Sequence, residues 1–111
     1  MQNPVVYFEI GCRDKAATRD FYSKLFDWPI DSDGRIKSEG SNPGGHINSL
    51  GHEPHHYTMF YVRVDNLQDS IARAESLGGK KLVGPVRLPG GDAFAWIQDP
   101  EGNTMGLYTG A

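Results

Sequence analysis

The stretch VVYFEIGC at residues 5–12 has the pattern of a β-strand, and YTMFYVRV at residues 57–64 has the same pattern. In both stretches apolar residues recur at every second position, which is typical of a strand with one face on a core. These apolar faces are Val6, Phe8, Ile10 and Cys12 in the first stretch and Phe60, Val62 and Val64 in the second. Each stretch precedes an amphipathic segment, so the sequence predicts a β-α-β unit that occurs twice.

Two aspartates stand where the helices of these units would begin, Asp14 and Asp65. We expect both to be N-caps, because a carboxylate there accepts hydrogen bonds from the first free N–H groups. The first helix is expected at residues 15–27 and the second from Leu67 to the glycines at 78–79. The residues expected to pack on the strands are Ala17, Phe21, Leu25, Phe26 and Trp28 in the first helix and Leu67, Ile71, Ala74 and Leu77 in the second. Asp65 follows Asp14 by 51 residues whereas Phe60 follows Phe8 by 52, so the repeat carries one residue of slippage.

The remaining segments read as short strands and turns. Further strands are expected at residues 35–39, 46–50, 81–86, 92–98 and 104–109. Asp99-Pro100-Glu101-Gly102 has the residue order of a type I turn. The glycine pairs Gly44-Gly45 and Gly90-Gly91 are interpreted as turns, since neither stands between a strand and a helix as a phosphate loop would.

Composition restricts the classes of protein. The chain has 111 residues, 38% hydrophobic and 23% charged, with a net charge of −3, which predicts one globular domain (residues 1–111) and no nucleic-acid or membrane partner. With a single cysteine, Cys12, an internal disulfide is impossible. Cys12 is interpreted as a buried core residue rather than a nucleophile. Because we find neither a secretory signal nor a membrane span, we expect a cytoplasmic protein.

Several of these segments together resemble the vicinal oxygen chelate superfamily, the group of glyoxalases, bleomycin-resistance proteins and extradiol dioxygenases. The similarity is greatest to small bacterial proteins related to lactoylglutathione lyase. The segments that carry it are Tyr7-Phe8-Glu9-Ile10, Asp14, Phe21-Tyr22, Gly44-Gly45, Asp99-Pro100-Glu101-Gly102-Asn103 and Gly106-Leu107-Tyr108. The resemblance implies an α+β fold in which paired βαβββ modules (about residues 4–50 and 57–110) form an open, curled mixed sheet with helices outside. It also implies a homodimer.

Metal-dependent members of this superfamily hold a divalent ion with His and Glu side chains on four strands. By the resemblance these positions fall on Tyr7, on a residue between His46 and Asn48, on Met59 and on Gly106. Met and Gly offer no hard donor and Tyr is an uncommon ligand, so we expect no catalytic metal.

The face opposite the expected core is the candidate ligand-binding surface. Its candidates are Tyr7, Glu9, His46, Met59, Tyr61, Arg63, Gly106 and Tyr108. Glu9 is the candidate acid–base residue, because a carboxylate in a partly apolar cavity tends to have a raised pKa; a salt bridge from Glu9 to Arg63 is the competing interpretation. Phe94 and Trp96 share a strand face that is either a stacking wall or core. The loop histidines His52, His55 and His56 are interpreted as solvated.

These observations favour a glyoxalase-like domain that binds a small organic molecule without a cofactor. One alternative is a lyase, isomerase or dioxygenase that uses Zn, Ni, Fe or Mn with His46, Glu9 and the loop histidines. The other is a metal-free acid–base enzyme that uses Glu9. Whether the protein is an enzyme stays open at this point.

Overall fold

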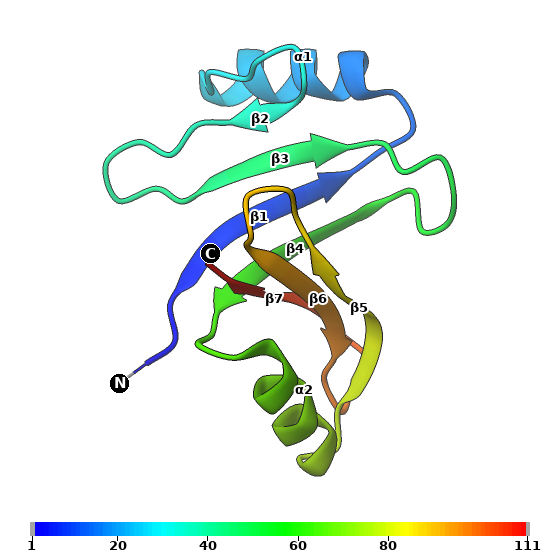
Figure 1. Cartoon of the computed structure of the whole chain (residues 1–111). Coiled ribbons are helices and arrows are strands. Elements are labelled where there is room, and N and C mark those ends of the chain that lie inside the picture. Colours follow the sequence, from blue (N-terminus) through cyan, green and yellow to red (C-terminus); the bar gives the residue numbers. More distant parts are fainter. Residues whose placement is uncertain (1, 111) are drawn as a thin grey trace. The chain divides into compact units, whose positions relative to one another are not determined.

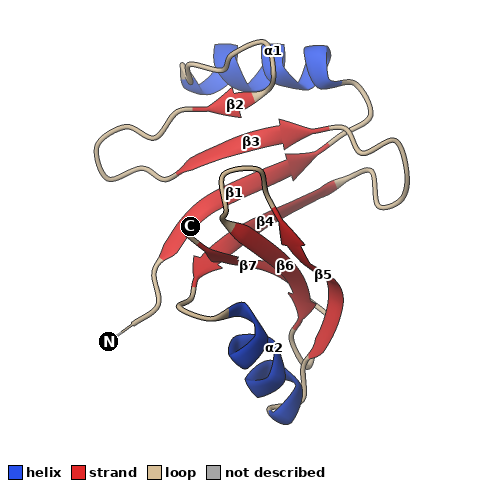
Figure 2. Cartoon of the chain, in the orientation of Figure 1, coloured by secondary structure: helices blue, strands red, loops and turns tan. Residues whose placement is uncertain are grey.

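The computed structural model describes residues 2–110, with seven strands and two helices in an α+β arrangement (Figures 1 and 2). The elements are β1 (Val5–Gly11), α1 (Lys15–Phe26), β2 (Arg35–Ile36), β3 (Gly44–Asn48), β4 (Tyr57–Arg63), α2 (Leu67–Ser76), β5 (Lys80–Arg87), β6 (Ala93–Gln98) and β7 (Thr104–Thr109). The strands belong to one open mixed sheet in the order β2-β3-β1-β4-β7-β6-β5. The predicted α+β class with an open mixed sheet is therefore confirmed, although within residues 2–110 the first module has three strands (β1, β2 and β3) and not the four of a βαβββ module.

The chain divides into two compact units, each with its own helix and core. One unit is Tyr7–Met59 and the other consists of the described residues before Tyr7 and after Met59. None of the helices within residues 2–110 is long and apolar enough to cross a membrane.

In the Tyr7–Met59 unit, β3 pairs in parallel with β1 and antiparallel with β2. Asp14 caps α1 as predicted, with its carboxylate accepting from the Ala17 N–H at 3.0 Å. The core contains the predicted strand residues Ile10 and Cys12, with Cys12 only 5% exposed. The rest of this core is Ile36 and Ile47, with Phe8, Tyr22, Trp28 and Ile30 packed against it. The interpretation of Cys12 as a core residue is confirmed.

The apolar stripe predicted for the first helix is wrong in its orientation. Phe21, Leu25 and Phe26 are 58%, 57% and 51% exposed. The helix residue that packs against the core is instead Tyr22, whose ring stacks on Trp28 at 5.8 Å. Aromatic residues occupy several faces of α1, so spacing alone did not identify the face that meets the sheet.

Gly44 and Gly45 are strand residues, which corrects their interpretation as a turn. In β3, Gly45 lies opposite Phe8 of β1. A Cβ at Gly45 would lie 2.6 Å from the Phe8 carbonyl oxygen, so only glycine allows this close approach. The strand therefore begins at Gly44 and ends at Asn48, two residues earlier than predicted.

In the other unit, α2 packs against β5, β6 and β7. Leu67 and Ile71 are buried in its core as predicted, together with Val64, Ala93, Ala95, Ile97 and Leu107. Leu77 and Phe60 are 66% and 45% exposed, contrary to prediction. Leu77 follows the last helical turn, so its side chain leaves the apolar stripe.

The N-cap of α2 is Asn66 and not Asp65. The Asn66 side chain accepts from the Asp69 N–H at 2.9 Å. Asn66 follows Asp14 by 52 residues, the same interval that separates Phe8 from Phe60. The two units therefore repeat without the one-residue slippage inferred from Asp65, because their strands and their N-caps are separated by the same interval.

We expect Asn66→Ala to lower the free energy of unfolding by about 1 kcal/mol, the typical effect of losing an N-cap. Asp65→Ala is the matched control and is expected to change it by less than about 0.5 kcal/mol, as surface substitutions usually do. Urea denaturation of both variants measures the difference. Equal destabilisation by the two substitutions would contradict this cap assignment.

The predicted turn at Asp99 is confirmed. The Gly102 N–H donates to the Asp99 carbonyl at 3.0 Å, and the Asp99 carboxylate accepts from the Glu101 and Asn103 N–H groups at 2.9 Å each. These donors, with the Asn103 side-chain amide first among them, lower the pKa of Asp99. The turn delivers the chain into β7.

Candidate functional site

A row of three ionisable side chains crosses β2, β3 and β1 in the Tyr7–Met59 unit. Arg35 is the register partner of His46, and His46 is the register partner of Glu9. Register partners on adjacent strands project from the same face of a sheet. The order across the strands is thus a cation, an imidazole and a carboxylate, and we refer to it as the Arg35–His46–Glu9 row.

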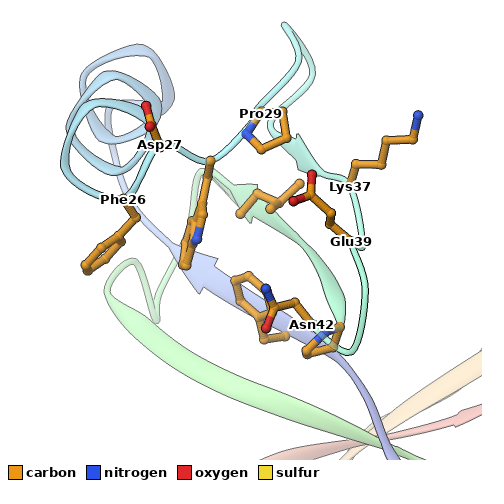
Figure 3. Close-up of a pocket in the computed structure, with 10 residues that line it drawn as sticks. Phe26, Asp27, Pro29, Lys37, Glu39 and Asn42 are labelled. Carbon is orange, nitrogen blue, oxygen red and sulfur yellow. The ribbon is translucent and has the colours of Figure 1, made fainter.

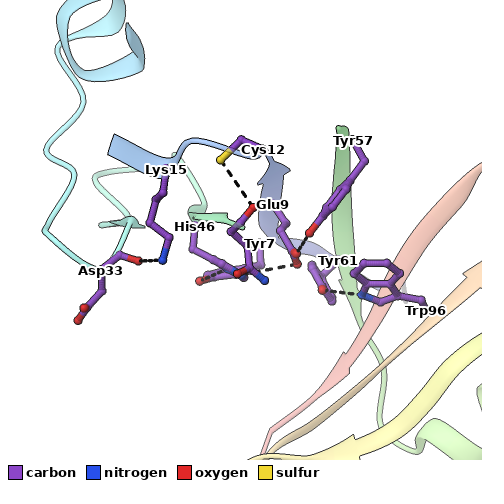
Figure 4. Close-up of polar contacts among 10 residues, drawn as sticks. Tyr7, Glu9, Cys12, Lys15, Asp33, His46, Tyr57, Tyr61 and Trp96 are labelled. Carbon is purple, nitrogen blue, oxygen red and sulfur yellow. Dashed lines mark hydrogen bonds and ion pairs between the residues drawn. The ribbon is translucent and has the colours of Figure 1, made fainter. Parts of the chain in front are cut away.

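Glu9 is the buried end of this row. It is 2% exposed, which is unusual for a carboxylate unless partners satisfy it. The Tyr57 hydroxyl donates to Glu9 Oε2, and His46 Nε2 lies 3.7 Å from Oε1 (Figure 4). Because Glu9 is covered, an incoming molecule would meet the more exposed His46 before it met the carboxylate.

His46 is held from its other nitrogen by Tyr7. His46 Nδ1 and the Tyr7 hydroxyl are 2.9 Å apart, and the two ring centroids lie 5.3 Å apart (Figure 4). Burial lowers the pKa of His46, with Glu9 opposing this effect and Arg35 and Lys15 adding to it. A neutral imidazole that accepts from Tyr7 at Nδ1 would carry its proton on Nε2, facing Glu9.

The two tyrosines of this cluster also have perturbed acidity. Burial is the main cause that raises the pKa of Tyr7. Burial likewise raises the pKa of Tyr57, and the hydrogen bond to Glu9 adds to the effect. Both phenols therefore stay protonated near neutral pH and serve as donors.

The stability of the protein is expected to depend on pH through His46. Because its pKa is lowered in the folded state, the unfolded chain binds more protons below about pH 6.5, and stability falls as the pH drops through that range. His46→Gln should lose less stability between pH 7.5 and 5.5 than the parent chain. Denaturation at several pH values tests this, with His52→Gln as the control that keeps the parental slope.

Tyr57 is a site residue that the sequence interpretation missed. Its ring lies against Gly11, where a Cβ would overlap the ring atoms. Glycine at position 11 therefore makes room for the ring whose hydroxyl reaches Glu9. The signal in the sequence was weak: both residues fall on the polar face of their strands, but 46 positions separate them.

The second unit holds a similar arrangement around Tyr61. Tyr61 is the register partner of Gly106, and a Cβ at Gly106 would overlap its ring. The Trp96 indole N–H donates to the Tyr61 hydroxyl at 2.9 Å. Tyr61 is only 6% exposed, so the space that a side chain at position 106 would need is filled by this ring.

Phe94 and Trp96 lie on the polar face of β6 and not in the core. The core residues of that strand are Ala93, Ala95 and Ile97, which alternate with them. The Phe94 ring meets Tyr61 edge-on at 6.2 Å. Of the two interpretations given for Phe94 and Trp96, core or stacking wall, the burial pattern of β6 agrees with the stacking wall.

The remaining candidates are placed as follows. Met59 is 6% exposed in the Tyr7–Met59 unit, while Arg63 is exposed in the other unit. The Tyr108 hydroxyl donates to the Asp92 carboxylate at 2.7 Å. Of the eight predicted ligand-binding residues, Tyr7, Glu9, His46 and Met59 lie in one unit and Tyr61, Arg63, Gly106 and Tyr108 in the other. Their convergence in one site, and the salt bridge between Glu9 and Arg63, stay predictions.

A groove that the sequence did not predict lies on the other face of β1 and β2. It has a volume of about 640 Å³. Its walls include the rings of Phe8 and Trp28. Phe26, the last residue of α1, also lines it (Figure 3). Phe8 alternates with Tyr7 and Glu9 along β1, so the groove is on the helix side of the strand, away from the row.

Three of the four residues at the positions of the superfamily's metal ligands do not suit a divalent ion, and only the fourth position, between His46 and Asn48, includes a common ligand type, His46. Gly106 has no side chain, and Tyr61 fills the adjoining space. Met59 offers a thioether and the Tyr7 hydroxyl is engaged with His46. Among residues 2–110 no three His, Cys, Asp or Glu side chains are grouped to hold a metal, the loop histidines included. His55 of that loop lies 3.6 Å from the exposed Glu53.

An open mixed sheet with repeated β-α-β units and a polar cluster on its strands defines a small α+β domain of the vicinal oxygen chelate type. The chain belongs to the glyoxalase-like domain family, which matches residues 6–108. A glyoxylase-like domain-containing protein from Didymella fabae is 29% identical over 114 residues, which cover 91% of this chain and 89% of that protein.

Solved structures share the fold at low sequence identity. Methylmalonyl-CoA epimerase from Mycobacterium tuberculosis has a TM-score of 0.71 and 14% identity, over 96% of this chain and 87% of that one. A hypothetical protein from Bacillus halodurans C-125 has a TM-score of 0.73 and 13% identity, over 100% and 96%. A Streptomyces coelicolor methylmalonyl-CoA epimerase variant in complex with 2-nitronate-propionyl-CoA has a TM-score of 0.66 and 15% identity, over 100% and 99%.

Proposed function

We propose that this protein binds a small organic molecule at the cluster of Tyr7, Glu9, His46 and Tyr57, without a divalent metal. The observation that carries the proposal is the buried carboxylate of Glu9, which accepts from Tyr57 and faces His46. Burying a carboxylate costs free energy of folding even when partners hold it, so such a group is unusual where it serves structure alone. Groups of this kind are concentrated at functional sites.

The donors of this cluster suit a polar group on a partly apolar molecule. Tyr7 and His46 are only partly buried, so their ring edges and faces are accessible for contact. Ligand sites commonly combine aromatic surface with a few oriented polar groups. The epimerase of the same fold that is complexed with a propionyl-CoA analogue supports the use of this scaffold for small molecules.

A melting-temperature screen in EDTA tests the proposal. A panel of aromatic acids, amides, phenols and acyl-CoA thioesters is expected to contain compounds that raise the melting temperature by mass action on the folded state. Tyr7→Phe and His46→Gln should reduce that rise, whereas His52→Gln, a matched change in the exposed loop, should preserve it. A panel without effect, or a rise that disappears in EDTA and returns with Zn²⁺ or Ni²⁺, would contradict metal-free binding.

Acid–base catalysis is the second candidate function, favoured by the contact between His46 and Glu9. In the tautomer described above, Nε2 carries the proton that faces Glu9 at 3.7 Å, so His46 can accept a proton only at Nδ1. A bound molecule would pass its proton to the Tyr7 oxygen while the Tyr7 hydroxyl proton moves to Nδ1, and Glu9 would stabilise the imidazolium. Glu9 would then act through His46 rather than as the contacting base. Glu9→Gln should abolish turnover of a bound compound and keep its affinity; full turnover in that variant would rule the candidate out.

We also propose that the protein is a homodimer, as its resemblance to the superfamily implies, and that it is cytoplasmic, as its single cysteine favours. Sedimentation equilibrium is expected to give twice the chain mass of 12.3 kDa. A monomer at all concentrations would exclude the dimer and leave the binding proposal intact.

A further inference from the structure

Arg35 is the accessible end of the Arg35–His46–Glu9 row. It is exposed, and as the register partner of His46 it projects from the same face of the sheet. Within residues 2–110 its guanidinium has no hydrogen bond or ion pair, while its backbone N–H donates to Asp31 at 3.0 Å. The backbone of Arg35 is therefore held in place, and its guanidinium, which has five N–H donors, is available to a ligand beside His46.

Two cations lie close enough to His46 to affect its pKa. Arg35 and Lys15 both lower the pKa of the imidazole, and Arg35 also lowers the pKa of Tyr7, where Glu9 and Asp31 oppose it. The Lys15 ammonium donates to the Asp33 carbonyl at 3.1 Å, which holds it in place.

Neither of the two nearby carboxylates forms an ion pair with the Arg35 guanidinium within residues 2–110, although Asp31 and Arg35 act on each other electrostatically. Asp31 Oδ1 accepts from the Asp33 and Arg35 N–H groups, at 2.9 and 3.0 Å, and so caps its own turn. Glu9 lies under the surface and faces Tyr57 and His46. Arg35 and Lys15 are thus the two cations that act on His46, and the Arg35 guanidinium keeps its donors for a ligand.

We propose that Arg35 determines specificity by binding an oxyanion of the ligand, a carboxylate or a phosphate, while the rest of the molecule lies against Tyr7 and His46. The guanidinium fork matches a planar carboxylate or a phosphate with two parallel hydrogen bonds. This inference rests on the proposed binding function and specifies its ligand class as small organic anions.

Three matched probes test the inference: benzoate, phenyl phosphate and benzamide, the last a neutral isostere of benzoate. NMR titration at constant ionic strength would follow the His46 imidazole signals in the parent chain, in Arg35→Gln and in Arg73→Gln. Arg73 is exposed on α2, so its substitution removes the same charge from the other unit. Arg35→Lys is a second variant at position 35, because it keeps the positive charge and loses the forked donor geometry of the guanidinium.

We expect benzoate or phenyl phosphate to bind roughly tenfold or more tightly than benzamide, the usual gain from a charge-assisted hydrogen bond. Arg35→Gln should remove this preference, Arg35→Lys should reduce it, and Arg73→Gln should keep it. Whichever of the two anions binds more tightly shows whether Arg35 prefers a carboxylate or a phosphate.

Equal affinity for benzamide and the anions, or a preference that survives Arg35→Gln, would overturn the role of Arg35. Binding of benzamide at His46 would then leave the proposed function standing. If neither anion shifts the His46 signals, the anion inference fails, and the melting screen decides separately whether the cluster binds other molecules.

Discussion

Gly106→Ala is expected to lower the free energy of unfolding by about 2–3 kcal/mol, the upper part of the range found when a packed site receives extra atoms. The new methyl group would overlap the Tyr61 ring, which is buried and held by the Trp96 indole. The ring cannot turn aside without losing that hydrogen bond. Urea denaturation of the purified variant measures the effect.

Two controls separate this contact from a general intolerance of alanine. Gly90→Ala should change stability by less than about 0.5 kcal/mol, because a Cβ there meets only Asp92 Oδ1, at 3.5 Å. In a Tyr61→Ala background, Gly106→Ala should have almost no additional effect, as a double-mutant cycle would show. The same destabilisation with and without the Tyr61 ring would refute this account of position 106.

Tyr57→Phe is expected to destabilise the protein by about 2–3 kcal/mol. The substitution leaves the buried Glu9 carboxylate without its hydroxyl donor, and hydrogen bonds to charged groups contribute more than neutral ones. Glu9→Gln should cost only about 1 kcal/mol, since the amide oxygen can still accept from Tyr57. Chemical denaturation at pH 7.5 gives both values.

Tyr22→Phe is the matched control for this comparison. The Tyr22 ring packs on Trp28, and its hydroxyl has no hydrogen bond within residues 2–110, so a change below about 0.5 kcal/mol is expected. In a Glu9→Gln background the effect of Tyr57→Phe should shrink, because the charge has gone. If Tyr57→Phe and Tyr22→Phe were equally mild, Tyr57 would not be the partner that stabilises Glu9.

Local patterns in the sequence predicted most of the fold. Alternation located β1 and β4, and the strand predicted after the turn at Asp99 has the bounds of β7 to the residue. Prediction failed where two local interpretations are equally good and only contacts in the folded protein decide between them. Asp65 and Asn66 are both residue types that favour the N-cap position. The N-cap is Asn66 because its side chain accepts from the Asp69 N–H in the first turn of the helix. Gly44 and Gly45 resemble a turn until Phe8 approaches them from β1.

The candidate site was predictable in part for the same reason. Tyr7 and Glu9 could be selected because both belong to the polar face of a strand, and His46 because it is the only common metal-ligand type at its position in the superfamily. Arg35 could not be joined to them, because the register of a two-residue strand leaves no periodic signal. Tyr57 was missed since its partners, Gly11 and Glu9, come from a distant strand, and the space for its ring depends on a glycine.

The central claim, that this glyoxalase-like scaffold binds its ligand without a divalent metal, is tested most directly by elemental analysis. The untagged protein, purified without chelators, would be analysed for Zn, Ni, Fe and Mn in parallel with His46→Gln. We predict far less than one equivalent of metal per chain, with the same trace amount in both proteins. One equivalent of metal in the parent chain that is lost in His46→Gln would contradict the account.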